Sequence, residues 1–327
     1  MTERRRDPIT GQWRMFASHR QNRTFLPPEQ LCPLCPTVDA DHPTEIPRPS
    51  YDVAVFDNRF PALTAHPPPP AMTGSDLYPV APALGANEVV VYSDQHHPTA
   101  AELGPARMDK VIAVWADRYG ELGRRDEIAY VFIFENRGEA IGVTLHHPHG
   151  QIYAYPEIPP LPATELAAAT AYLEATGRCV LCDVVARERS DGVRLVAQNG
   201  SFVAFVPFAA RFPYEVHVAS RRHATSVTDL TDPERRLLAE LLVTVRRGLD
   251  GLFGFPLPFV MSVHQAPTED AGWLPVSHLH IEFTPVHRTA TKLKYLAGSE
   301  LGGGAFINDA APETTAAAIR VALLAEE

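Results

Sequence analysis

The sequence lacks any long apolar run: no stretch approaches the roughly 18–20 apolar residues that a membrane-spanning helix needs. Its first residues are basic, but no apolar segment follows them, so we expect no signal peptide. It also lacks a basic surplus, since 29 lysines and arginines against 39 acidic residues give a formal charge of −10. A nucleic-acid partner held by phosphate neutralisation is therefore not expected. We predict a cytoplasmic protein that binds neither membrane nor nucleic acid.

Cysteine is scarce, with four residues in a chain of 327. The four form two pairs of C-x-x-C spacing, Cys32 with Cys35 and Cys179 with Cys182. Such a pair suits a metal ion or a redox dithiol, and without a secretion signal a disulfide framework is the weaker interpretation. A single pair is equally consistent with the packing of two small apolar side chains. The residues that follow each pair therefore decide between these interpretations.

Each cysteine pair is followed by the same series of landmarks, which indicates an internal duplication. The series runs from an Arg-Phe-Pro tripeptide to a glutamate, then to a histidine eight residues further on, and it ends on a His-x-His. The landmarks are Arg59, Glu88, His96 and His147-Pro148-His149 in the first half, and Arg211, Glu215, His223 and His278-Leu279-His280 in the second.

Between the single histidine and the His-x-His, each half has a helical pattern followed by a strand-rich segment. Residues 108–122 and 234–252 repeat apolar side chains at a spacing of three and four, as one face of a helix requires. Residues 128–134 and 259–263 are rich in β-branched and aromatic residues. We therefore predict an α+β fold: an internally duplicated unit with antiparallel sheets and flanking helices, divided into repeats at 1–160 and 161–327.

Two cysteines and two histidines recur together in each half, which predicts two zinc ions per chain. Thiolates and imidazoles are the donors that tetrahedral Zn2+ prefers, and four protein ligands leave no open position, so each site is expected to be structural. A second set in the second half adds a carboxylate to three histidines, and its oxygen donor makes iron the alternative metal there. The presence of two cysteines favours the thiolate set. The sets are Cys32, Cys35, His96 and His147; Cys179, Cys182, His223 and His278; and, as the alternative, Glu165, His264, His278 and His280.

The segment His147-Pro148-His149-Gly150-Gln151 carries the predicted chemistry. Side chains two apart on a strand share a face, so we expect His147, His149 and Gln151 to point the same way. A neutral imidazole is a good nucleophile toward phosphorus, which predicts a labile N–P bond on His149. Gln151 can donate an amide N–H to a phosphate oxygen, where negative charge accumulates. The second His-x-His is followed by Ile281-Glu282 instead, so that half is expected to be structural.

This segment resembles the active-site motif of the galactose-1-phosphate uridylyltransferase family, a branch of the histidine-triad superfamily. The resemblance begins at Pro8-Ile9-Thr10-Gly11-Gln12-Trp13 and covers nearly the whole chain. It implies the first zinc set, a catalytic His149 assisted by Gln151, and a homodimer. The substrate contacts that it implies are Arg20 and Arg23 for the nucleotide diphosphate; Asn58 and Phe60 for the base and ribose; Asn136, Gly142 and Thr144 for the phosphate; and Lys294, Tyr295 and Glu300 for the hexose in the partner subunit's site.

The activity implied by the resemblance is a ping-pong exchange of UMP between UDP-glucose and galactose 1-phosphate, through a uridylyl group on His149. One alternative of the same fold is an ADP-sugar phosphorylase or adenylyltransferase. It draws on the second C-x-x-C, which is shared with a relative that acts on ADP-glucose, and on Arg59, which replaces an acidic residue of well-known members. The other alternative is a non-catalytic zinc-binding module. That alternative is weaker, because such a module has no need of Gln151.

Overall fold

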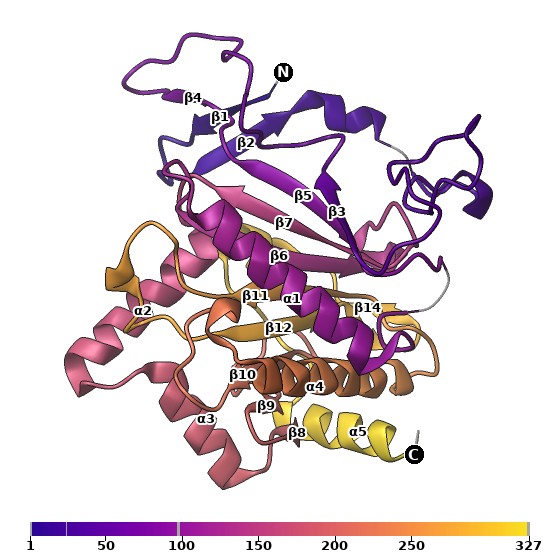
Figure 1. Ribbon diagram of the computed structural model, residues 1–327. Coiled ribbons are helices and arrows are strands. Elements are labelled where there is room, and N and C mark those ends of the chain that lie inside the picture. Colours follow the sequence, from indigo (N-terminus) through magenta and orange to yellow (C-terminus); the bar gives the residue numbers. More distant parts are fainter. Residues whose placement is uncertain (1, 24, 97–98, 326–327) are drawn as a thin grey trace.

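One nine-stranded sheet runs through the computed structural model, which describes residues 2–23, 25–96 and 99–325 (Figure 1). The strand order is β3-β5-β7-β6-β11-β12-β10-β9-β8, and every neighbouring pair is antiparallel. The strands of the first half are β3 (Ala54–Asp57), β5 (Ala86–Val91), β6 (Tyr130–Arg137) and β7 (His149–Tyr155). Those of the second half are β8 (Leu195–Gln198), β9 (Phe202–Phe205), β10 (Val216–Ser220), β11 (Phe259–His264) and β12 (His280–Pro285).

The two halves repeat the same three-strand unit in opposite directions from the junction between β6 and β11. The order β5-β7-β6 of the first half reappears as β10-β12-β11 in the second. Gln151 is the third residue of β7 and pairs with Val89 of β5, and Glu282 is the third residue of β12 and pairs with His217 of β10. Gln151 and Glu282 therefore hold equivalent places in the two repeats. The predicted α+β fold with a duplicated, antiparallel unit is confirmed.

Two long helices cover one face of the sheet, α1 (Gly104–Gly123) and α4 (Asp232–Gly251), which also pack against each other. Both were expected from their apolar spacing. Trp115 of α1 and Leu242 of α4 are fully buried among apolar side chains of the strands. A reciprocal capping box starts α4: Glu234 N donates to Thr231 Oγ1, and the Glu234 carboxylate accepts from Thr231 N at 2.9 Å.

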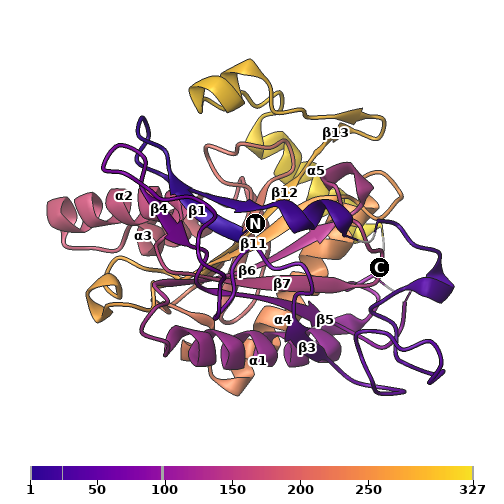
Figure 2. The same ribbon diagram turned by 90° about the horizontal axis from the view of Figure 1, so that it is seen from above.

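The remaining elements lie around this layer. Figure 2 shows α1 at one side of the view and the segment containing β13 at the other, with the large sheet between them. No helix among the described residues combines the length and the apolar character that crossing a bilayer requires. The strands around the large sheet are β1 (Thr2–Arg6), β2 (Trp13–Ala17) and β4 (Val80–Pro82), which form a small sheet, and β13 (His287–Thr289) and β14 (Lys292–Leu293), which form a hairpin. The helices around it are α2 (Pro160–Thr176), α3 (Val180–Asp191) and α5 (Pro312–Leu324). Short helical turns lie at Ser18–Asn22, Glu29–Leu31, Glu139–Ile141, Val227–Asp229, Ala271–Trp273 and Gly298–Gly302.

Candidate active site and metal groups

The four predicted ligands of the first zinc site lie together, with their ligand atoms all within 4.8 Å of one another. Cys35 Sγ is 3.3 Å from His96 Nδ1 and 3.5 Å from His147 Nδ1. Cys32 Sγ is 4.0 Å from His147 Nδ1. Around a tetrahedral zinc ion, sulfur and nitrogen ligands are about 3.5 Å apart, as the usual bond lengths require. The donor types and their spacing therefore fit zinc.

His147 is held in the state that a metal ligand needs. Its Nε2–H donates to the backbone oxygen of Ser93 at 2.7 Å, so Nδ1 is left with its lone pair toward the two thiols. Burial lowers the pKa of His147 to about 4, which keeps the ring neutral near pH 7. A carbonyl partner on the far nitrogen and a neutral ring are both typical of metal-bound histidine.

The second predicted set repeats this arrangement. Cys182 Sγ is 3.6 Å from His223 Nδ1 and 3.4 Å from His278 Nδ1, and Cys179 Sγ is 3.6 Å from His278 Nδ1. His278 Nε2–H donates to the backbone oxygen of Ser220 at 2.8 Å, and burial lowers the pKa of His278 to about 4. The two groups differ in exposure, because His223 is exposed and both cysteines here are only half-buried.

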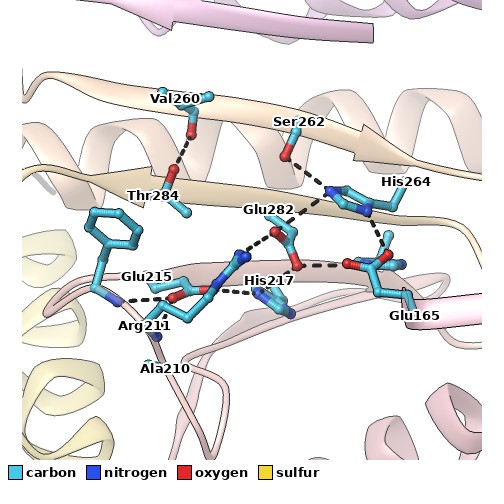
Figure 3. A network of polar contacts seen from close by, with 12 residues as sticks. Glu165, Ala210, Arg211, Glu215, His217, Val260, Ser262, His264, Glu282 and Thr284 are labelled. Atoms are coloured by element: carbon cyan, nitrogen blue, oxygen red, sulfur yellow. Dashed lines mark hydrogen bonds and ion pairs between the residues drawn. The ribbon is translucent and has the colours of Figure 1, made fainter. Parts of the chain in front are cut away.

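The alternative carboxylate set forms a separate group that does not include His278. Glu165, His264 and His280 bring their ligand atoms within 4.8 Å, and Glu165 Oε2 accepts from His264 Nδ1 at 2.8 Å. Beside them the buried Glu282 carboxylate lies among His264, His217 and Arg211 (Figure 3). Because Glu282 holds the place of Gln151, this half has an anion where the first half has a neutral amide.

His149 is the first residue of β7, and the prediction that His147 lies on the same strand is wrong. His147 lies in the bend before the strand, and His278 likewise precedes β12, which begins at His280. The bend lets the carbonyl of His147 accept from His149 Nδ1 at 2.7 Å. That bond places the proton on Nδ1 and leaves the lone pair on Nε2. Burial lowers the pKa of His149, which favours the neutral ring.

A pocket opens at His149. Three arginines in its wall provide positive charge for an anionic ligand. The pocket brings together seven of the residues predicted from the sequence, which are Arg20, Arg23, Asn58, Phe60, Thr144, His149 and Gln151; Arg59 is the third arginine.

Five other predicted contacts lie elsewhere. Asn136 lines an adjoining cavity that also reaches His149, and Gly142 ends the turn before Thr144 with a φ of 78°. The segment predicted to contact the hexose does not line either cavity: Lys294 Nζ pairs with Glu300 Oε1 at 3.2 Å, and the side chains of both are buried. Tyr295 between them is 76% exposed, so it is free to contact another molecule.

Two of the residues at the pocket that were not predicted carry polar groups that contact its arginines. Glu45 lines it, and its carboxylate pairs with Arg59 at 3.2 Å. It lies on an irregular loop, where no periodicity could have indicated it. Tyr153 accepts from Arg20 Nη1 at 2.9 Å. Tyr153 could have been found, since it follows His149 and Gln151 at the same spacing of two along β7.

Comparisons with known proteins agree with this geometry. The family model described as galactose-1-phosphate uridyl transferase, N-terminal domain, matches residues 1–159, and its C-terminal counterpart matches residues 165–326. The galactose-1-phosphate uridylyltransferase of Thermotoga maritima is 35% identical over 98% of both chains. A solved structure described as a uridylyltransferase superposes with a TM-score of 0.89 at 38% identity, covering 99% of both chains.

A more distant solved structure is an ADP-glucose phosphorylase from Arabidopsis thaliana with bound ADP-glucose. It has a TM-score of 0.74 at 25% identity and covers 98% of this chain and 99% of its own. It is a relative of the same fold. Since two family models together cover nearly all of the sequence and a curated relative matches end to end, this chain belongs to the galactose-1-phosphate uridylyltransferase family.

Proposed function

We propose that this enzyme transfers a uridylyl group from UDP-glucose to galactose 1-phosphate through a covalent intermediate on His149. The observation that carries the proposal is the hydrogen bond from His149 Nδ1 to the carbonyl of His147, which leaves Nε2 unprotonated at the pocket. The Nε2 lone pair attacks the α-phosphorus, and the bond from that phosphorus to the oxygen of glucose 1-phosphate breaks. A phosphate oxygen of galactose 1-phosphate then attacks, and the N–P electrons return to His149.

The other pocket residues have roles that follow from their charge and hydrogen-bonding groups. Arg20 and Arg23 offer charged donors to the diphosphate, and Gln151 and Thr144 offer neutral donors to the phosphate oxygens next to His149. Asn58 and Phe60 are assigned to the base and ribose. Asn136 and Gly142, on the other side of His149, are assigned to the phosphate of the leaving or entering hexose phosphate.

We also propose that each chain holds two zinc ions, in the two Cys2His2 groups. Zinc supplies no chemistry to the transfer; when bound, it cross-links the loop of Cys32 and Cys35 to His147, whose carbonyl orients His149. Iron is the alternative metal in the second half, and Glu165, His264 and His280 are the residues there with an oxygen donor.

The proposal extends to the assembly. We assign residues 1–160 to the repeat that carries the nucleophile, and residues 161–327 to the repeat with the second metal site and a substrate-contacting segment. In a homodimer, the segment of Lys294, Tyr295 and Glu300 reaches the hexose in the partner subunit's site. Two observations support that arrangement: Tyr295 is exposed, and none of the three residues lines its own His149 pocket. Four free cysteines, grouped with histidines, agree with a cytoplasmic protein.

The test is whether the enzyme forms the covalent intermediate. Incubation with UDP-glucose alone is expected to add one uridylyl group, detected by intact-mass measurement and mapped to the peptide of His149. Galactose 1-phosphate is expected to remove it. A parallel incubation with ADP-glucose separates the two activities, because an adenylyl adduct discharged by inorganic phosphate would assign the chain to the ADP-sugar phosphorylase activity instead. No adduct with either donor would contradict a histidine nucleophile.

A further inference from the structure

A fully buried ion pair lies behind the strand that carries the nucleophile. Both carboxylate oxygens of Glu135 accept from the guanidinium of Arg246, each at 2.8 Å. Arg246 is 0% exposed, and its guanidinium lies over the rings of Phe259 and Phe283, at 5.4 and 5.6 Å. Glu135 belongs to β6 in the first half and Arg246 to α4 in the second. The pair therefore joins the two halves beneath the active site.

Stability alone is a weak reason for such a pair. Removing two charges from water costs about as much as their attraction returns, and well-packed apolar residues often serve equally well. Among the described residues, the other ion pairs between helices α1 and α4 and the sheet, Arg118 with Glu88 and Arg137 with Asp250, each keep a partly exposed side chain, whereas Arg246 is not exposed at all. A charged pair in these surroundings calls for a role other than packing.

Tyr92 and β6 lie against Gly150, the residue that follows the nucleophile. Tyr92 is buried, and burial and the neighbouring Glu135 carboxylate raise the pKa of Tyr92 well above its usual value. Its hydroxyl occupies the space where Gly150 would carry a Cβ, and the backbone oxygen of Phe134 lies 3.1 Å from the same point. Gly150 follows His149 directly, so its backbone is held from behind by Tyr92 and by β6 (residues 130–137).

Glu135 and His149 also line one cavity, the one that adjoins the active-site pocket. When the imidazole attacks phosphorus, its ring becomes positively charged. A fixed carboxylate behind the strand stabilises that charge without any rearrangement during the reaction.

We propose that Glu135, held by Arg246, is a positioning residue for the transfer reaction: together with Tyr92 it holds β6 and Gly150 behind His149, and it presents a buried negative charge at the cavity beside the imidazole. This inference rests on the proposed function, because it assigns a role in forming the nucleotidyl–histidine. This role also explains why α4, which has no residue in the pocket, contributes a buried arginine that bonds Glu135 of β6.

The experiment measures the rate of adduct formation in a single turnover with UDP-glucose, for Arg246→Lys and Tyr92→Phe. Lysine cannot make the paired contact with Glu135, and phenylalanine removes the Tyr92 atom that lies nearest the Cβ position of Gly150. We expect the rate constant in Arg246→Lys to fall about 10- to 100-fold with KM little changed, as misplacement of a reacting group predicts. Tyr92→Phe is expected to lose less, at an unchanged melting temperature, because Tyr92 Oη makes no hydrogen bond of normal geometry with the described residues.

The matched control is Arg194→Lys. Arg194 pairs with Glu188 at 2.8 Å, both side chains are nearly buried, and the pair is remote from His149 and on neither cavity wall. It is expected to lower the melting temperature without changing the rate. If Arg246→Lys and Tyr92→Phe form the adduct at the wild-type rate, the inference is wrong while the proposed function stands. If the wild-type enzyme forms no adduct, both are wrong. Should Arg246→Lys fail to fold, Tyr92→Phe alone decides.

Discussion

Asn58 Nδ2 donates to Gln151 Oε1 at 3.3 Å. Asn58 follows β3, and Gln151 lies on β7. The Oδ1 of Asn58 accepts from the backbone N–H of Phe60 at 2.8 Å, and this bond fixes the orientation of the Asn58 amide. Since Asn58 occupies the oxygen of Gln151, the amide nitrogen of Gln151 is the end left to donate into the pocket. The residue assigned to the base thus orients the residue assigned to the phosphate.

Replacing Gln151 by arginine is expected to slow transfer by roughly 10²–10³-fold, the usual loss when a transition-state donor is removed. A bulky cation also cannot accept from Asn58, so the side chain must leave its present position. Pre-steady-state kinetics of adduct formation and discharge would show it. Asn58→Ala is the comparison, and its loss should be smaller because Gln151 keeps its donor. Equal rates in Gln151→Arg and the wild-type enzyme would remove Gln151 from the mechanism.

The two histidines of the first His-x-His should separate stability from chemistry. His147→Ala removes a ligand of the first metal group, and we expect a clear fall in melting temperature together with the loss of one equivalent of zinc. His149→Ala should keep both and form no adduct. Thermal melts, metal content and intact mass on the two variants provide the check. A His149→Ala enzyme that melts well below His147→Ala would reverse the two assignments.

Metal analysis after purification without added metal should give two zinc ions per chain. Cys182→Ser is expected to remove one and to leave adduct formation intact, because its group lies in the half without the nucleophile. Cys35→Ser, the matched change in the first half, should remove one zinc and the activity as well. The exposed His223 predicts that a chelator strips the second site first. Finding one zinc, or iron in place of the second, would favour Glu165, His264 and His280 as metal ligands.

The capping box of α4 predicts a pH-dependent contribution to stability. The hydrogen-bonded guanidinium of Arg222 and the capping contacts at Thr231 lower the pKa of Glu234 to about 2, from an ordinary value of 4.5. Because the folded-state pKa is the lower one, the contribution is fully present above about pH 4.5 and disappears as the pH falls toward 2.

Glu234→Gln should therefore cost about 0.5–1 kcal/mol of unfolding free energy at pH 7, the size of a well-formed surface pair. Urea unfolding of both proteins at several pH values tests the sign: the difference between them should shrink on acidification. A difference that grows on acidification would show that the carboxylate is not stabilised by Arg222 in the folded protein.

The sequence was sufficient for the fold and for the centre of the site. The long helices were predictable because each buries one apolar stripe, and the metal groups because cysteine is rare and its spacing recurs. The two His-x-His segments show where pattern reasoning was incomplete: both histidines could lie on one strand, but β7 and β12 each begin at the second one. In both halves the carbonyl of the first histidine accepts from Nδ1 of the second. Glu45 was out of reach, because its loop has no period from which a partner such as Arg59 could be inferred.

The alignment of the two repeats within the sheet also differs from the alignment that their spacing along the chain indicates. Equal gaps of eight residues equate Glu88 with Glu215. In the sheet, Val89 lies opposite Gln151 and His217 lies opposite Glu282, so Glu88 is equivalent to Val216. The loop from β10 to His223 is therefore one residue shorter than the loop from β5 to His96. Equal spacing along the chain conceals a loop that differs in length by one residue. The pairing of the strands shows which residues of the two repeats are equivalent.

The pairing of β6 with β11 has a consequence for how the chain can be divided. The halves are joined there by backbone hydrogen bonds, with Phe134 opposite Ser262, and the covalent link at residues 156–159 adds only a tether. A protein nicked in that tether would stay assembled. Expressed as separate fragments, each half would present β6 or β11 as an open edge. Each fragment would then pair either with its complement, restoring the enzyme, or with copies of itself.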